Sequence, residues 1–212
     1  MIRLAISVEG RTEEEFVKQV LADYLRRRNV EPTPVLLGRA RSTGQGGGNV
    51  TVERLTQEMV RLYPDFNAVT SLVDFYGFKD KGNRTVDELE EYLHEQIGSR
   101  IARSWNETRV FPYVQQYEFE GLLFSDVSAF ARVGDIGMPE NVEELRNARS
   151  QFPTPEDIND NRDTAPSKRI EKVMPQYQKV VHGPLLAEEI GLDTIRDECP
   201  RFDAWVTRME SL

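Results

Sequence analysis

Short apolar runs recur over the first half of the chain at spacings that suit strands separated by helices. Residues 4–8 (LAISV) and 68–73 (AVTSLV) are rich in apolar and β-branched side chains. Such runs are typical of strands buried on both faces of a parallel sheet. Residues 35–37 and 109–114 are two further candidate strands, and Pro112 places the latter at a sheet edge or at a bulge.

Amphipathic stretches lie between these runs. Thr12 followed three residues later by Glu15 has the pattern of a capping box, and so has Thr85 followed by Glu88. Apolar residues spaced for one helix face follow each box, and residues 52–62 have the same spacing. The sequence therefore predicts three helices between four strands.

The alternation of strands and helices predicts the fold class. An α/β domain with a parallel sheet flanked by helices on both faces accounts for the pattern over residues 1–140. Residues 141–212 show no convincing strand pattern and are divided by six prolines, which are Pro153, Pro155, Pro166, Pro175, Pro184 and Pro200. We expect this part to be a helical C-terminal extension packed on the first domain.

Charge and composition exclude several classes of protein. The 27 basic and 36 acidic residues give a formal charge of −9, the wrong sign for passive binding to nucleic acid. No apolar run of about 18 residues is present, so we expect no membrane-spanning segment and a cytoplasmic protein. The single cysteine, Cys199, excludes an internal disulfide, and two distant histidines leave little material for a zinc site.

Carboxylates follow three of the predicted strands. Glu9 comes directly after the first strand, Asp74 after the third, and Glu118 and Glu120 shortly after the fourth, while Glu13 lies four residues beyond Glu9. Ligands of open parallel sheets bind beyond the carboxyl ends of the strands. Clustered carboxylates repel one another unless a cation neutralises them, and hard oxygen ligands suit Mg²⁺ or Mn²⁺. The pattern indicates a metal site for phosphodiester chemistry.

Each of these residues also has a structural interpretation. Acidic residues in the first turn of a helix, such as Glu13, favour the helix dipole without any further role. An aspartate at a strand end, such as Asp74, is commonly a cap or a turn former. Glu120 is explained equally well as a solvated helix residue. The combination of Glu9 and Asp74 at parallel strand ends favours a site over these interpretations.

Basic residues offer candidate phosphate contacts. Lys168 and Arg169 follow Pro166 at a predicted helix start, where backbone donors and two cations together could hold a phosphate. The alternative is a solvated basic face. Arg39 and Arg41 lie in a glycine-rich segment that lacks the Gly-Lys-Ser/Thr of a P-loop. A mobile loop is the first interpretation of this segment, and a phosphate-contacting role for the two arginines is the alternative.

Several segments together resemble a known family. VEGRTEEEFV after the first strand and LVDFYGF at the third are similar to the Toprim domain of topoisomerases, primases and OLD-type nucleases. These two segments, with QQYEFEGLLFSD, TAPSKRI, HGPLLAEEIGL and CPRFDAW, resemble the domain of unknown function family 4276 over almost the full length. The resemblance implies a Toprim-like sheet, with Glu9 and Glu13 serving metals as in the OLD-type nucleases.

The resemblance also implies partners and an activity. Genes of the family often lie beside ATPases of bacterial defence modules, so an ATPase partner protein is expected. The sequence departs from Toprim at one point, because Tyr76 stands where the second acid of the Asp-x-Asp pair is found. Three hypotheses follow. The first is a Mg²⁺-dependent nuclease acting on DNA or RNA, with Glu9 and Asp74 as catalytic residues. The second is a non-catalytic subunit of an ATPase complex, and the third is a hydrolase of small phosphates or nucleotides that uses the same carboxylates.

Overall fold

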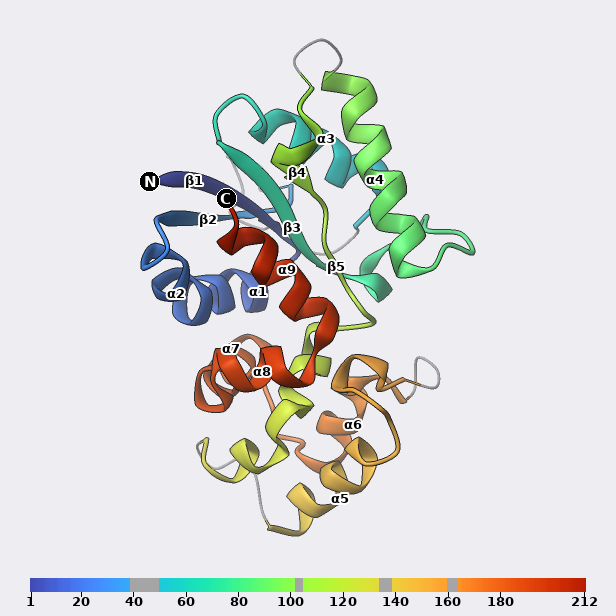
Figure 1. Cartoon of the computed structure of the whole chain (residues 1–212). Helices are drawn as coiled ribbons and strands as arrows, with labels where there is room; N and C mark the ends of the chain where they lie inside the picture. Colours follow the sequence, from blue (N-terminus) through green and yellow to red (C-terminus); the bar gives the residue numbers. More distant parts are fainter. Residues whose placement is uncertain (39–49, 102–104, 134–138, 160–163) are drawn as a thin grey trace. The chain divides into compact units, whose positions relative to one another are not determined.

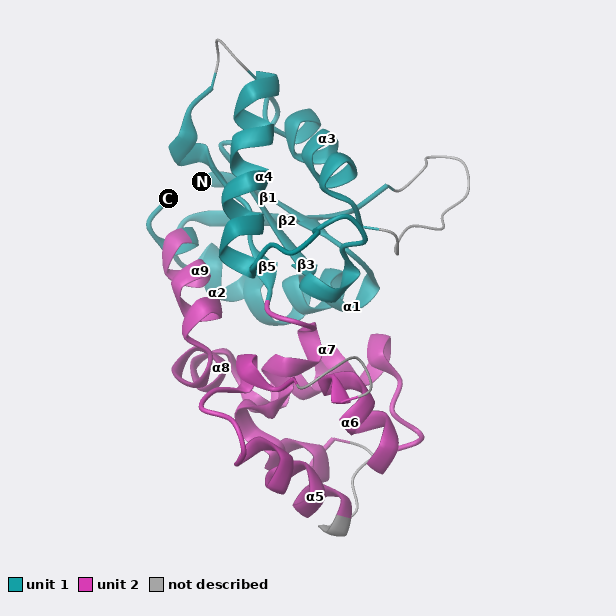
Figure 2. Cartoon of the chain, turned by 90° about the vertical axis from the view of Figure 1, so that its right-hand side faces the viewer, with its two compact units in different colours: residues 1–115, 209–212 teal, residues 116–208 magenta. Residues whose placement is uncertain are grey.

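The computed structural model describes residues 1–38, 50–101, 105–133, 139–159 and 164–212 (Figure 1). The chain divides into two compact units, one of residues 1–115 with 209–212 and the other of residues 116–208 (Figure 2). The sequence predicts a division after residue 140, whereas residues 116–140 belong to the second compact unit. Among the described residues, no helix combines the length and the apolar character needed to cross a membrane.

The first unit contains a five-stranded parallel sheet. The strands have the spatial order β2-β1-β3-β4, and β5 also pairs with β3. The described elements of this unit are β1 (Ile2–Val8), α1 (Arg11–Phe16), a π-helical turn (Val17–Leu21), α2 (Ala22–Arg26), β2 (Val30–Leu36), α3 (Val52–Leu62), β3 (Ala68–Asp74), a 3-10 turn (Phe75–Gly77), α4 (Val86–Ile101), a 3-10 turn (Glu107–Arg109), β4 (Val110–Phe111) and β5 (Val114–Gln115). The predicted α/β fold class with a parallel sheet is confirmed.

Helices cover both faces of this sheet. Alternate strand residues such as Ala5, Val69 and Val73 pack with apolar side chains of α3 and α4 in one buried cluster. The intervening residues of β1 are buried as well, and α1 and α2 contact β1 and β2. Because β1 and β3 are buried on both faces, their sequences are apolar-rich rather than alternating.

The second strand is longer than the sequence predicts. It covers Val30–Leu36 and pairs with β1 from Ile2↔Val30 to Val8↔Leu36. Pro32 and Pro34 lie inside it, and they conceal the strand in the sequence pattern because proline cannot donate to a sheet ladder. Both are accommodated because β2 is an edge strand, as its place in the sheet order shows.

The fourth predicted strand is interrupted where its proline lies. β4 pairs with β3 at Val69↔Val110, and β5 pairs with β3 again at Asp74↔Gln115. Pro112 and Tyr113 separate the two short strands. The proline therefore acts as the sequence predicts, at the edge of the sheet, and the ladder resumes only two residues later.

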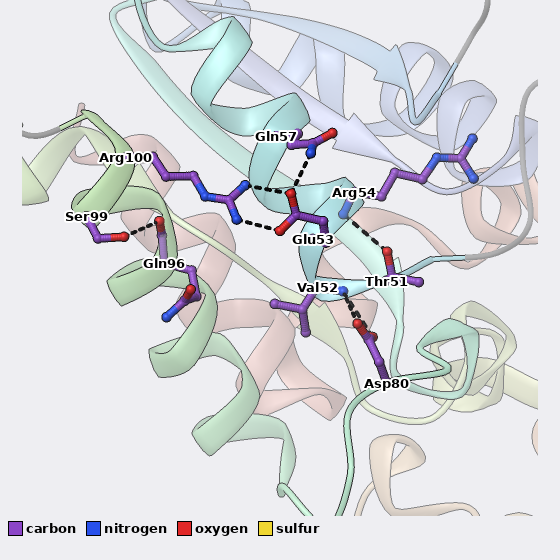
Figure 3. A network of polar contacts seen from close by, with 9 residues as sticks. All are labelled: Thr51, Val52, Glu53, Arg54, Gln57, Asp80, Gln96, Ser99 and Arg100. Carbon is purple, nitrogen blue, oxygen red and sulfur yellow. Dashed lines mark hydrogen bonds and ion pairs between the residues drawn. The ribbon is translucent and has the colours of Figure 1, made fainter.

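Polar contacts fasten α3 to its surroundings (Figure 3). Both carboxylate oxygens of Asp80 accept hydrogen bonds from the backbone N–H of Val52, at 3.0 and 3.1 Å, at the start of α3. Glu53 pairs with Arg100 and so connects α3 to α4. A carboxylate at a helix N-terminus satisfies an otherwise unpaired donor and favours the helix dipole.

The second unit is built from helices in the part that the structure describes. A long 3-10 segment (Phe119–Ala131) contacts α5, α6, α7 and α8. The remaining elements are α5 (Pro139–Arg149), a 3-10 turn (Pro155–Asp157), α6 (Pro166–Val173), α7 (Lys179–Ile190), α8 (Leu192–Glu198) and α9 (Pro200–Glu210), whose last residues belong to the first unit. Pro166 and Pro200 each open a helix, where a missing N–H costs nothing.

A buried carboxylate holds the start of α9. Glu156, 3% exposed, accepts hydrogen bonds from the backbone N–H groups of Arg201 and Phe202, at 2.9 and 3.1 Å. Burial raises the pKa of this carboxyl group, although the two backbone donors oppose the shift. Glu156 therefore has a structural role within the second unit.

Candidate functional site

Glu9 and Asp74 lie together at the carboxyl ends of neighbouring strands. Val8, the last residue of β1, pairs with Leu72 of β3, so both chains leave the sheet at the same edge. The carboxylate of Glu9 accepts a hydrogen bond from the backbone N–H of Asp74, with a distance of 3.3 Å between Oε2 and N. Asp74 is 7% exposed. This pair is the part of the predicted site that the geometry brings together most directly.

A glycine makes room for the Glu9 carboxylate. A Cβ atom on Gly77 would lie 2.4 Å from Oε2 of Glu9, closer than any real contact of that kind. Gly77 was not among the predicted site residues. Its position three residues after Asp74 was the available signal, because a glycine near a polar strand end often permits a close approach.

Glu13 lies on the first turn of α1, which begins directly after Glu9. It is 3% exposed, and its Oε2 accepts a hydrogen bond of 2.9 Å from the backbone N–H of Gly10. The helix thus begins at Gly10 rather than at the predicted Thr12, and Glu13 supplies the capping carboxylate in place of Glu15. The predicted capping box of Thr12 with Glu15 is wrong. A capping role for Glu13 is compatible with a metal role, because a carboxylate has two oxygens.

The neighbouring glutamates of α1 have structural partners. Glu14 and Glu15 both pair with Lys18, at 2.8 and 2.9 Å. The hydrogen bond from Lys18 lowers the pKa of Glu15, and Glu14 raises that of Lys18. Glu14 and Glu15 therefore have ion-pair roles, whereas the capping role belongs to Glu13.

The donor set at this edge fits a hard divalent ion in chemistry. Glu9, Glu13 and Asp74 offer carboxylate oxygens, the ligands that Mg²⁺ and Mn²⁺ prefer. Gly77 provides the space beside Glu9 that a side chain would fill. Over the described ranges, however, no group of three or more His, Cys, Asp or Glu side chains is already arranged as a metal cluster.

Glu118 and Glu120 belong to the second unit and flank the start of its 3-10 segment. Oε2 of Glu118 accepts a hydrogen bond of 3.0 Å from the backbone N–H of Ser167, in the first turn of α6. Glu120 is fully buried, and its Oε2 pairs with Nζ of Lys179 at 2.8 Å. The interpretation of Glu120 as a solvated helix residue is wrong.

The surroundings of Glu120 make its charged form less favourable than it is in water. Burial raises the pKa of Glu120, the charge of Lys179 opposes that rise, and the nearby Glu118 adds to it. Oε1 of Glu120 and the hydroxyl of Tyr177 are both buried without a hydrogen-bond partner among the described residues. Burial, and next the charge of Glu120, raise the pKa of Tyr177 well above its ordinary value. Lys179 and Tyr177 were missed by sequence reasoning.

The structure places one pair of the predicted phosphate contacts, and their role toward phosphate stays a prediction. Lys168 and Arg169 lie in the first turn of α6, as predicted, where Lys168 pairs with Glu171 at 2.6 Å. Nε of Arg169 donates to the carbonyl oxygen of Thr164 at 2.7 Å. Both residues line one pocket of the second unit. Arg39 and Arg41 lie outside the described residues.

The candidate residues therefore form two groups. In the first unit Glu9 and Asp74 lie together, and Glu13 caps the helix that starts directly after Glu9. A second group in the other unit consists of Glu118, Glu120, Lys168, Lys179 and Tyr177. The hypothesis that the carboxylates of both groups share one metal stays a prediction.

Comparison with known proteins gives a family and one structural likeness. The structure is similar to that of the C-terminal region of the Xanthomonas campestris pv. campestris OLD protein, with 17% sequence identity and a TM-score of 0.47. The superposition covers 98% of this chain and 94% of the OLD chain. Comparison with curated proteins gave no match. The family model described as a domain of unknown function, DUF4276, matches residues 8–210. Because the match covers nearly the whole sequence, the chain belongs to the DUF4276 family.

Proposed function

We propose that this protein is a divalent-metal-dependent nuclease that hydrolyses phosphodiester bonds of DNA or RNA. The observation that carries the proposal is the contact between Glu9 and the backbone of Asp74 at the carboxyl ends of β1 and β3. This is where open parallel sheets place their ligands. Glu9, Glu13 and Asp74, all residues of the first unit, would hold Mg²⁺ or Mn²⁺.

The chain's own residues have defined tasks in this proposal. A bound divalent ion lowers the pKa of water and neutralises charge on a phosphate oxygen. The N–H of Asp74 orients the Glu9 carboxylate, and Gly77 leaves space for it because glycine has no side chain. In this position the carboxylate can bind the ion or accept a proton from the attacking water. The N–H of Gly10 orients Glu13 in the same way.

The negative charge of the chain requires local cations for a nucleic-acid substrate. A formal charge of −9 repels polyanions, and Lys168 and Arg169 are the two cations that we assign to the phosphate backbone. Their shared place on α6 supports that assignment. An ATPase partner, as the family resemblance implies, could supply further positive surface.

Metal binding and cleavage test the proposal directly. We expect millimolar Mn²⁺ or Mg²⁺ to give a calorimetric signal and a rise in the thermal unfolding midpoint, and oligonucleotides to be cleaved only when metal is present. Cleavage of mononucleotides with no cleavage of oligonucleotides would contradict a nuclease. Oligonucleotides left intact, even with metal bound, would do the same.

A second candidate function is a non-catalytic subunit of an ATPase complex. Two observations favour it: Tyr76 replaces the second acid of the Asp-x-Asp pair, and the described residues contain no preformed cluster of three metal-ligating side chains. Absence of both a calorimetric signal and a thermal shift with Mn²⁺ would support this candidate over the nuclease.

Replacement of Gly77 by alanine tests the positioning of Glu9. The new Cβ would displace Oε2 of Glu9, and because that atom ends a flexible side chain, the change moves the carboxylate at little cost in stability. We expect cleavage in Mn²⁺ to fall about 10- to 100-fold, as for other losses of ligand orientation, with an almost unchanged unfolding midpoint.

The matched control is Gly98→Ala in α4, where the new Cβ would meet the Trp105 ring at 2.9 Å and no candidate ligand. Its cleavage rate should equal that of the wild type, even if its stability changes. Equal rates for Gly77→Ala and Gly98→Ala would contradict the positioning role of Gly77.

A further inference from the structure

A pocket of about 260 Å³ lies between α5 and α6, entirely within the second unit. Leu145 and Ala148 of α5 and Val173 of α6 form apolar parts of its wall. These three side chains are buried. Drug-sized ligands occupy pockets of roughly 300–1,000 Å³, so this pocket suits a smaller molecule.

Cations dominate the polar part of the wall. Among the described residues that line the pocket, Lys168, Arg169 and Lys172 face one carboxylate, Glu144, and Glu171 pairs with Lys168 from outside the lining. The local excess of positive charge contrasts with the formal charge of −9 for the whole chain. Such a concentration of one sign in a concave site attracts ligands of the opposite sign.

The charged residues differ in how firmly they are held. Nε of Arg169 donates to Thr164 O, and its guanidinium lies 5.4 Å from the centre of the Phe152 ring, so the group is fixed from two sides. Lys172 pairs with Glu144 across the two helices, but the two side chains are 75% and 55% exposed. An exposed pair of this kind contributes little, so Lys172 can turn to a ligand at small cost.

We propose that this pocket binds a small phosphomonoester, about one nucleotide in size. The cations Lys168, Arg169 and Lys172 would contact the phosphate, and the apolar wall would cover the organic part. This inference goes beyond the proposed nuclease: it shares Lys168 and Arg169 with the nucleic-acid contacts proposed above, but it adds a separate small-molecule site and needs none of Glu9, Glu13 and Asp74.

Isothermal titration calorimetry in EDTA tests the pocket without any contribution from a metal. The titrants are AMP, ribose 5-phosphate, inorganic phosphate and adenosine. We expect AMP and ribose 5-phosphate to bind, inorganic phosphate to bind more weakly than either, and adenosine to give no signal. Binding should weaken with added salt, because screening reduces charge attraction.

Two variants separate charge from shape. Lys172→Gln should weaken AMP binding by about tenfold, as expected for loss of one charge-assisted contact. Ala148→Leu keeps every charge but fills the pocket, and it should also weaken binding. The control Arg146→Gln removes an exposed cation of α5, which pairs with Glu143 and does not line the pocket. It should bind AMP like the wild type.

Several outcomes would overturn the inference. The first is that millimolar AMP gives no heat. The second is that adenosine or inorganic phosphate binds as tightly as AMP. The third is that Lys172→Gln binds AMP as well as Arg146→Gln does. Thermal unfolding of each variant shows whether it is folded, and Lys172→Gln decides the matter if Ala148→Leu does not fold. Because EDTA is present throughout, a negative result here leaves the role of Glu9 untouched, and a failure of cleavage leaves the pocket untouched.

Discussion

Glu9→Gln is expected to reduce metal-dependent cleavage by about 10²–10⁴-fold, the range for loss of a group that binds metal or moves a proton. The amide has the size of the carboxylate and keeps an oxygen that can accept from the N–H of Asp74. The fold should therefore survive, while the negative charge that attracts a cation is lost. Rates of oligonucleotide cleavage in Mn²⁺, with thermal unfolding measured beside them, provide the check.

Glu15→Gln is the matched control for this experiment. It makes the same chemical change on the partly exposed side of α1, at a residue that pairs with Lys18. We expect nearly wild-type cleavage from it. If Glu9→Gln cleaves as fast as Glu15→Gln, the assignment of Glu9 fails, and so does the metal site built on it.

Lys179→Met is expected to lower the free energy of unfolding of the second unit by about 3 kcal/mol, near the lower end of the range for breaking a buried ion pair. Its side chain is 39% exposed, and this exposure moderates the effect, whereas Glu120 is fully buried. The variant leaves the Glu120 carboxylate without its cation. Chemical denaturation at neutral pH measures the loss.

The pH dependence of this variant has a defined sign. Burial already raises the pKa of Glu120, and loss of Lys179 removes the charge that opposes the rise. A carboxyl group with a raised pKa in the folded state is tolerated while it is protonated, and stability is lost as pH increases through that pKa. Lys179→Met should therefore be least destabilised in mildly acidic solution and most destabilised at neutral pH.

The double variant Lys179→Met with Glu120→Gln completes the test. Replacing the carboxylate removes the unpaired buried charge, so the double variant should be more stable than Lys179→Met alone at neutral pH. Equal stability of the two variants at neutral pH would show that the pair does not contribute in the way that its geometry indicates.

The sequence predicted the sheet where periodicity and burial agree. β1 and β3 are buried on both faces, so their apolar runs were plain. Prediction was weaker at β2, because Pro32 and Pro34 have low strand propensity and are tolerated only since β2 lies at the edge of the sheet. It also failed at the start of α1, because a glycine without a side chain is the N-cap and the cap comes from Glu13.

The candidate site was predictable where topology alone brings residues together. Parallel strands end at one edge, so Glu9 and Asp74 could be paired from the sequence. Lys179 and Tyr177 could not, since their approach to Glu120 depends on packing between segments about 60 residues apart in the chain. Local pattern also could not show that Glu120 is buried, because it depends on the same packing.

The Asp80 cap has a mechanical consequence for the acidic edge. The stretch from Asp74 to Asp80 is anchored at one end by β3 and at the other by α3, where Lys79 N–H also bonds the carbonyl of Val50. Gly77 lies inside this doubly tied span. A displacement of the first turn of α3 would therefore move the backbone around Gly77, and with it the position available to the Glu9 carboxylate.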